Sequence, residues 1–344
     1  MDLNNPLVSI IILNYNHEKF LKQRINSILN QTFQDFEIII LDDLSSDGSV
    51  FIINSYKNNP KISSILINKK KSGSPFIQLV KGLNICKGSF IWIAESDDYS
   101  EPDFLEKTIG LFRKDNKLSL VYTDSKIVDA SGKELGLWKN KKNFFFKSDK
   151  WSKDYVNLGL NEIVETLLFK CTINNMSAVL FRKKDLLNID LTKLVEFKNV
   201  GDLYVYSMTI LDGNIGYISE PLNNYREHSE NLTKKSLISG TLYKERIEYL
   251  NKVLSVLELK NVNSSKFNFS IGSFLIKNIF FALDFKYYRS VFDLLKRLKK
   301  CFFRRKINYY KVYGLLIIYS IIPRTRIRSF TKQILKKEIV TIVL

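Results

Sequence analysis

The sequence predicts an α/β fold in which a mainly parallel sheet is flanked by helices. Apolar, β-branched runs alternate along the first third of the chain with segments whose apolar residues recur at helical spacing. A strand–helix–strand order needs crossover connections, which give parallel strands with helices on both faces. The three stronger runs each end in polar residues, and the carboxyl ends of parallel strands form an edge where ligands bind.

The elements expected in the first third follow directly from this alternation. A continuous run such as LVSIIIL is typical of a strand buried on both faces. The predicted strands are 7–13, 36–41, 63–67 and 90–94, and the helices between them are 18–30, about 49–56 and 76–86.

The middle of the chain predicts fewer regular elements. We expect the segment 135–170, which is rich in aromatic residues and lysine, to be irregular, and the polar segment 182–194 to be exposed. Further strands are predicted at 118–128, 177–181 and 213–219, with a helix from about 200 to 211.

Composition restricts the class of protein. With 45% hydrophobic and 26% charged residues, the chain is globular rather than disordered. Its 3 cysteines have no metal-ligand spacing, and residues 1–6 lack a secretory signal, so we expect a cytoplasmic protein in a reducing compartment. Neither a GxGxxG nor a P-loop motif is present, so neither kind of phosphate-binding loop is indicated.

Positive charge is concentrated at the C-terminal end. Residues 241–344 hold 22 Lys and Arg against 6 Asp and Glu, a net charge of +16, and residues 1–240 hold 31 against 29, a net charge of +2. The sequence therefore predicts a near-neutral body, residues 1–235, and a basic helical C-terminal region, residues 236–344.

Three carboxylates follow the apolar run at 90–94. Glu95, Asp97 and Asp98 stand where this strand would leave the sheet, and their mutual repulsion would be relieved by a divalent cation. One acid there could instead cap the helix that Pro102 would begin. Since a cap accounts for one acid rather than three, the pattern favours a metal site.

Four motifs carry a resemblance to a known family. They are VSIIILNYNHEKFL, SILNQTFQDFEIIILDDLSSDGS, GSFIWIAESDDYSEPDFLE and VGDLYVY, in this order. On them, residues 6–230 resemble a family 2 glycosyltransferase of the GT-A fold, from the bacterial group that builds capsule, O-antigen and related polysaccharides. The resemblance implies a nucleotide-diphospho-sugar transferase fold.

The resemblance also implies the residues that bind the nucleotide and the metal. Tyr15 resembles the aromatic residue that stacks on the base, and Asp43 the acid that hydrogen-bonds it, conventionally uracil. Mn²⁺ or Mg²⁺ is the implied cofactor, with Asp98 the first choice of ligand; Glu95 stands where the family has Asp. The implied nucleotide contacts are Leu13, Tyr15, Asn16, Asp43, Asp97 and His228, and the implied metal ligands are Asp98, Asp97 and Glu95.

Asp202, in Gly201-Asp202, resembles the general base of the family. Its alternative is a cap for the helix that begins there. His228 would contact the diphosphate or the metal, although a surface imidazole is the competing interpretation, and His17 is expected only near the nucleotide loop. Lys71 could meet a phosphate.

The resemblance therefore implies an inverting, metal-dependent transferase. It would move a sugar from a nucleotide-diphospho-sugar, a UDP-sugar being the expected donor, to a hydroxyl of a glycan or lipid-linked glycan. The alternative is a non-catalytic, donor-binding scaffold subunit of a polysaccharide assembly complex. The segment 135–170 would set acceptor choice, but neither the sugar nor the acceptor can be named.

The basic region suggests attachment to the inner face of the cell membrane. Helices are predicted at 242–259, 274–285 and 291–306, and the apolar run 312–322 is too short to cross a bilayer of about 30 Å. Cations beside aliphatic and aromatic residues suit an anionic membrane surface. A helical domain without a membrane role is the alternative, and nucleic acid is the less favoured partner.

Overall fold

The computed structural model describes residues 5–168, 170–228 and 239–262, together with residues 236, 279, 282, 283, 287, 289–294 and 296. The chain divides into two compact units. The sheet unit consists of Met1–Leu160 and Thr172–Ser229, and the helical unit of Asn161–Cys171 and Glu230–Leu344. The predicted boundary at 235/236 lies close to this division, but residues 161–171 group with the later part of the chain.

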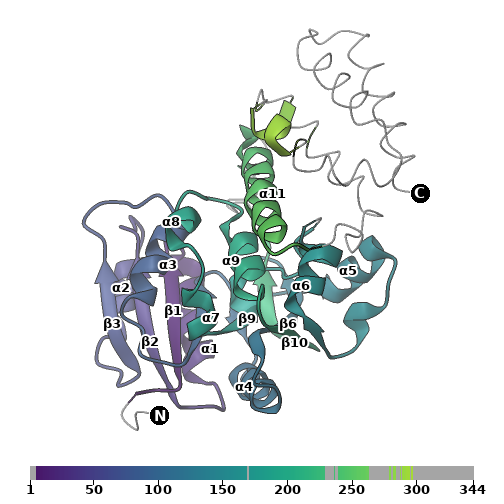
Figure 1. Cartoon of the computed structure of the whole chain (residues 1–344). Coiled ribbons are helices and arrows are strands. Elements are labelled where there is room, and N and C mark those ends of the chain that lie inside the picture. Colours follow the sequence, from purple (N-terminus) through teal and green to yellow (C-terminus); the bar gives the residue numbers. More distant parts are fainter. Residues whose placement is uncertain are drawn as a thin grey trace. The chain divides into compact units, whose positions relative to one another are not determined.

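The N-terminal part of the sheet unit is parallel, as predicted. Its strand order is β3-β2-β1-β4, and all three ladders in it are parallel. Figure 1 shows helices lying against these strands. The strands are β1 (Val8–Asn14), β2 (Phe36–Asp42), β3 (Ile62–Ile67) and β4 (Phe90–Glu95), and the helices are α1 (Glu18–Leu29), α2 (Ser49–Ser55) and α3 (Pro75–Leu83).

The rest of the sheet is mixed. A long parallel ladder joins β6 (Leu118–Val128) to β10 (Asn214–Arg226), but β9 (Val179–Arg182) runs antiparallel between β4 and β6. The short strands β5 (Tyr99–Ser100), β7 (Glu134–Leu137) and β8 (Tyr155–Leu158) are antiparallel too. The strand predicted at 213–219 continues to Arg226 as β10. Pro221, which lacks an N–H, does not end it, because this residue lies at a register shift in the ladder with β6.

The expectation of an irregular segment at 135–170 is wrong. It holds α5 (Trp138–Phe146), a 3₁₀ turn at Lys150–Ser152, β8, α6 (Gly159–Glu162) and a π-helical turn at Ile163–Leu167. The buried face of α5 carries Lys142, so no apolar period marked this helix. The segment 182–194 likewise forms α7 (Lys183–Leu187) and α8 (Leu191–Leu194) and buries one leucine from each.

The main core lies between the sheet and its helices. One face of β1 packs against Leu21, Ile25 and Ile28, the apolar stripe of α1, and these side chains are fully buried. The helix α4 (Phe104–Lys114) contributes Phe104, whose ring stacks on Trp92 of β4. This packing fixes the carboxyl ends of β1, β2 and β4 along one edge of the sheet.

The helical unit contains one long helix among its described residues, α11 (Thr241–Leu259), which confirms the prediction at 242–259. Within this unit the hydroxyl of Tyr249 donates a hydrogen bond to the carbonyl of Leu167 over 3.2 Å. The predicted helices at 274–285 and 291–306 lie mostly outside the described residues, and the run 312–322 lies wholly outside them. In the part that the structure describes, no helix combines the length and hydropathy needed to cross a membrane.

Candidate active site

The acid cluster lies where β4 ends. Glu95 is the last residue of this strand, and its backbone N–H donates to the Ser177 hydroxyl over 3.0 Å. Asp98 is only 2% exposed. One of its oxygens accepts from the backbone N–H of Arg226 over 2.9 Å, and the other accepts from the side-chain amide of Asn175. Asp98 is therefore held from β10 and from the segment before β9.

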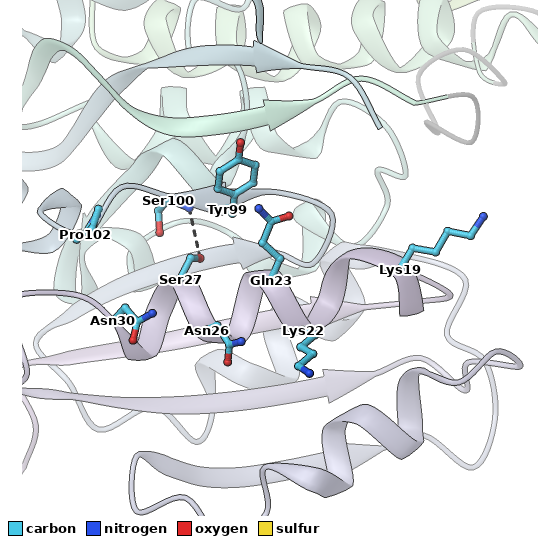
Figure 2. Close-up of a pocket in the computed structure, with 9 residues that line it drawn as sticks. All are labelled: Lys19, Lys22, Gln23, Asn26, Ser27, Asn30, Tyr99, Ser100 and Pro102. Carbon is cyan, nitrogen blue, oxygen red and sulfur yellow. Dashed lines mark hydrogen bonds between the residues drawn. The ribbon is translucent and has the colours of Figure 1, made fainter. Parts of the chain in front are cut away.

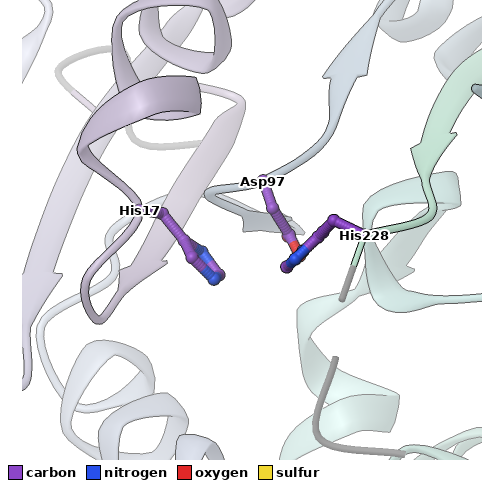
Figure 3. Close-up of side chains that lie close together, drawn as sticks. All are labelled: His17, Asp97 and His228. Carbon is purple, nitrogen blue, oxygen red and sulfur yellow. The ribbon is translucent and has the colours of Figure 1, made fainter. Parts of the chain in front are cut away.

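Asp97, by contrast, meets the two histidines of the chain (Figure 3). Nε2 of His228 lies 3.0 Å from Oδ2 of Asp97, and Nδ1 of His17 lies 2.8 Å from the hydroxyl of Ser96. One ligand atom each from His17, Asp97 and His228 lies within 4.8 Å of the other two. Two imidazoles and a carboxylate are a donor set that fits a divalent cation.

Burial and mutual repulsion set the protonation of these acids. Burial and the neighbouring charge of Asp98 raise the pKa of Glu95 well above its ordinary value. Burial and Asp97 raise the pKa of Asp98 to about 7. Burial would raise the pKa of Asp97 too, but the hydrogen bond with His228 and the charge of His17 hold it below its usual value. Ionised Asp97 therefore faces the histidines.

A buried arginine lies close to the acids. Arg24 of α1 is fully buried, with its guanidinium carbon 5.0 Å from the ring centroid of Trp92. Within the described residues, none of its three guanidinium nitrogens has a hydrogen-bond partner. Burial lowers its pKa to about 10, and the charges of Asp98, Glu95 and Asp97 oppose that shift. Arg24 therefore acts as an unbonded counter-charge to the cluster.

The predicted nucleotide residues lie at the ends of the neighbouring strands. Tyr15, directly after β1, is 38% exposed, and the ammonium of Lys71 lies 3.7 Å from its ring centroid. Asn16 has a left-handed φ of 54° and accepts the backbone N–H of Ser46 over 2.7 Å. Leu13 is half-buried in β1. These contacts join the loops that follow β1 and β2.

Asp43, which follows β2, accepts five hydrogen bonds. Its donors are the side chains of Asn68 and Gln78 at 2.6 and 2.7 Å, the N–H and hydroxyl of Ser72 at 2.7 and 2.9 Å, and the N–H of Gly73 at 3.1 Å. Burial alone would raise its pKa, but the hydrogen bonds from Ser72, Asn68 and Gly73 hold it below the usual value. In this structure both oxygens of Asp43 hold the loop before α3.

Asp202 lies in the first turn of α9 (Gly201–Thr209). Its Oδ1 accepts from the backbone N–H of Leu203 over 2.7 Å, and its charge contributes to the raised pKa of Glu95. A Cβ at Gly201 would come within 2.6 Å of the Phe76 ring, so close packing against α3 positions this turn. The structure thus brings Asp202 near the acid cluster.

Three residues of the site were not assigned from the sequence: His17, Arg24 and Asn175. Arg24 had a usable signal, since it falls within the buried stripe of α1 between Leu21 and Ile25. Asn175 and the meeting of His17 with His228 had none, because their partners are remote in the chain.

A surface pocket of about 600 Å³ lies between α1 and the segment that contains β5 (Figure 2). The side chain of Gln23, at its edge, accepts from the guanidinium of Arg226 over 2.8 Å. The lining residues are Lys19, Lys22, Gln23, Asn26, Ser27, Asn30, Tyr99, Ser100 and Pro102.

Comparison with solved structures shows the fold. TarS from S. aureus in complex with UDP has a TM-score of 0.55 at 16% identity, over 98% of this chain and 88% of that one. Mannosyltransferase PcManGT from Pyrobaculum calidifontis, in complex with GDP-Man and Mn²⁺, has a TM-score of 0.52 at 12% identity, over 99% and 86%. The sheet unit accordingly has the GT-A fold predicted for it.

Comparison with known sequences gives the family. Residues 9–174 match the model described as Glycosyl transferase family 2. Chondroitin synthase from Escherichia coli is 39% identical over 128 residues, which are 37% of this chain and only 18% of that protein. An uncharacterized glycosyltransferase from Haemophilus influenzae is 27% identical over 339 residues, 89% of this chain and 98% of that one. Residues 9–174 therefore form a glycosyl transferase family 2 domain, and the protein carries the domain of a glycosyltransferase.

Proposed function

We propose that the protein is an inverting, metal-dependent glycosyltransferase of cell-surface polysaccharide synthesis, of the capsule or O-antigen type. It moves a sugar from a UDP-sugar to a hydroxyl of a glycan or lipid-linked glycan. The observation that carries the proposal is the meeting of Asp97 with His228 at the end of β4, close to Asp202. A UDP complex of TarS and the relationship to chondroitin synthase support the donor and acceptor classes.

The donor nucleotide is assigned to the loops after β1 and β2. The exposed ring of Tyr15 offers a face on which a base can stack, between Leu13 and Asn16. Lys71, which covers that face at 3.7 Å, would leave it and turn to a phosphate. Asp43 remains the proposed reader of uracil, and one of its five donors would give way to the base N–H.

The diphosphate is assigned to the end of β4. Asp97 and His228 would hold Mn²⁺ or Mg²⁺ there, with Asp98 and Glu95 behind them. When bound, the cation neutralises charge on the leaving nucleoside diphosphate. Asp98 was the first choice from the sequence, but its two oxygens already accept from Arg226 and Asn175, so we now place Asp97 first.

Asp202 is the proposed general base. Its carboxylate takes the proton of the acceptor hydroxyl as that oxygen forms a bond to the anomeric carbon. The bond from that carbon to the diphosphate oxygen breaks on the opposite face, so the configuration inverts and the nucleoside diphosphate leaves with the electron pair.

The test is nucleotide release by the purified chain with a panel of nucleotide sugars, with and without Mn²⁺. We expect Asp202→Asn to lower turnover by at least ~10²-fold, the scale for losing a general base. Calorimetric affinity for UDP should be nearly unchanged, because Asn has the same size and its side-chain oxygen can still accept from the N–H of Leu203; the N-cap of α9 is Val200, so no helix cap is lost. The matched control is Asp212→Asn, which makes the same exchange of a carboxylate for a carboxamide at an exposed residue just beyond α9. Wild-type turnover in Asp202→Asn would place the base elsewhere, and donor binding without turnover in the wild type would favour a scaffold subunit.

We further propose that residues 236–344 attach the enzyme to the inner face of the cell membrane. The net charge of +16 over residues 241–344 supports this, because each well-placed cation adds about 1 kcal/mol of attraction to anionic lipid. Full-length protein should sediment with anionic liposomes but not with neutral ones, and added salt should release it. Equal sedimentation with both kinds of liposome, or with neither, would contradict the proposal.

A further inference from the structure

The chain has only 2 histidines in 344 residues, and both lie at one place. His17 precedes α1 and His228 follows β10, yet their ring centroids are 5.7 Å apart with the rings at 88° to each other. Neither ring is fully exposed. Figure 3 shows the two rings on either side of the Asp97 carboxylate, directed toward a common space.

The distances suit ligands of one ion. Two neighbouring ligand atoms on an octahedral cation at about 2.1 Å lie about 3 Å apart, and the Asp97–His228 pair is separated by 3.0 Å. Opposite ligands would lie about 4.2 Å apart, so the 4.8 Å upper bound of the triad needs to close by about half an ångström. A small side-chain rotation supplies that movement.

The ring of His17 is already oriented. Its Nδ1 is engaged by the Ser96 hydroxyl at 2.8 Å, which leaves Nε2 as the nitrogen available to a cation. The chain beside it is fixed as well, since the N–H of Glu18 donates to Asp47 over 2.9 Å, and the Glu18 carboxylate accepts from Gly48 over 2.9 Å. An imidazole held in this way by a second residue is typical of a metal ligand.

We propose that His17 is the third protein ligand of the metal, with Asp97 and His228, and that the two imidazoles make the site select a transition-metal dication over Mg²⁺. The inference rests on the proposed function only in placing a cation at the end of β4. Three protein ligands leave coordination positions open on the side of the donor diphosphate.

The ligand chemistry gives the selectivity. Mg²⁺ prefers oxygen ligands and gives up its water reluctantly, so two imidazole nitrogens add little to its binding. Nitrogen ligands strengthen binding in the order Mn²⁺, Fe²⁺, Co²⁺. The site should therefore bind Mg²⁺ most weakly, Mn²⁺ more tightly and Co²⁺ more tightly still.

Calorimetry on the untagged full-length protein tests this with MgCl₂, MnCl₂ and CoCl₂ alone. We expect Mn²⁺ to bind at least ~10-fold more tightly than Mg²⁺. His17→Gln should weaken Mn²⁺ binding by no less than the ~10–100-fold that loss of an outer-shell partner costs. Lys57→Gln, an exposed change in the turn after α2, is the matched control and should leave Mn²⁺ affinity unchanged. Equal affinities for Mg²⁺ and Mn²⁺, or full Mn²⁺ affinity in a folded His17→Gln, would overturn the inference.

A second measurement needs no variant. In protein labelled with ¹⁵N-histidine, every ring-nitrogen signal comes from His17 or His228. Stoichiometric Zn²⁺ should shift one nitrogen of each ring; a shift confined to His228 would remove His17 from the site. Neither measurement requires sugar transfer. Metal bound by both histidines without turnover would therefore contradict the proposed function and support this inference. Metal-dependent transfer with an unresponsive His17 would do the reverse.

Discussion

Two acidic sites at the same edge of the sheet differ in how well the surrounding protein stabilises their ionised carboxylates. Asp43, after β2, is matched by five hydrogen-bond donors within 3.1 Å, and its pKa is lowered. Glu95 and Asp98, at the end of β4, have raised pKa values, because they are buried beside one another and beside Asp97. The donors of the protein satisfy the first site, and at the second the surrounding protein does not fully stabilise the ionised forms of Glu95 and Asp98.

The difference teaches how a ligand site can be recognised. Buried carboxylates with a full set of donors stabilise a fold. Crowded carboxylates opposed by Arg24, a guanidinium with no hydrogen-bond partner among the described residues, retain a demand for positive charge. That demand, together with two histidines, is the reason why we propose a cation at the end of β4.

The largest expected effect is at Asp97. Asp97→Asn removes the ionised group that faces both histidines, and should lower sugar transfer by about 10³-fold, or ~4 kcal/mol of transition-state stabilisation. Turnover at saturating Mn²⁺ and saturating UDP-sugar measures this; Asp43→Asn, the comparison variant, changes the proposed reader of uracil and should raise the KM for the donor rather than lower turnover. Equal losses in the two variants would break the distinction between the sites.

The next effect is on stability. Arg24→Met removes the counter-charge and leaves the acids buried, so it should lower the free energy of unfolding by about 3 kcal/mol in metal-free protein. Mn²⁺ should restore more stability to this variant than to the wild type, because it supplies the missing positive charge. Urea denaturation with and without Mn²⁺ measures both, with Arg113→Met on the exposed side of α4 as control. A variant as stable as the wild type without metal would show that Arg24 does not offset the acids.

The smallest effect is at Asp43, and it depends on pH. Asp43→Asn loses charge-assisted hydrogen bonds and should cost about 1–2 kcal/mol at pH 7. Because the pKa of Asp43 is lower in the folded state, its contribution is present above the unfolded value of 3.8 and disappears as pH falls through the folded value. Urea unfolding at pH 7 and at progressively lower pH should show the two proteins converging. A difference that stays constant with pH would mean that Asp43 acts through packing.

Predictions from the sequence were most accurate for the continuous apolar runs that form buried strands. The run at 90–94 became β4 at Phe90–Glu95, and the run at 36–41 became β2 at Phe36–Asp42, because strands buried on both faces have few alternatives. The acid cluster was predicted for the same reason, since the strand end is where the apolar run stops.

It failed where contacts remote in the chain decide the structure. α5 buries Lys142 against the aromatic rings of Tyr122, Trp151 and Tyr217, a pattern that resembles an exposed polar segment until its partners are known. Nothing in the sequence indicated that His17 belongs to the site, because its neighbour in space, His228, is more than 200 residues away in the sequence. The antiparallel direction of β9 could not be predicted, because the four residues of this strand carry no information about the direction of its partners β4 and β6.

The hydrogen bonds of Arg226 have a consequence for the order of folding. Its backbone N–H reaches Asp98 across 128 positions of the chain, and its guanidinium reaches Gln23 across 203. β1 to β4 can pair through short crossovers, but contacts so remote in sequence form slowly because long loops must close first. During synthesis the N-terminal strands can assemble while the site still lacks β10 and His228. Metal binding at the proposed site should therefore appear only after β10 has joined the sheet, which would make it a signal that the domain is complete.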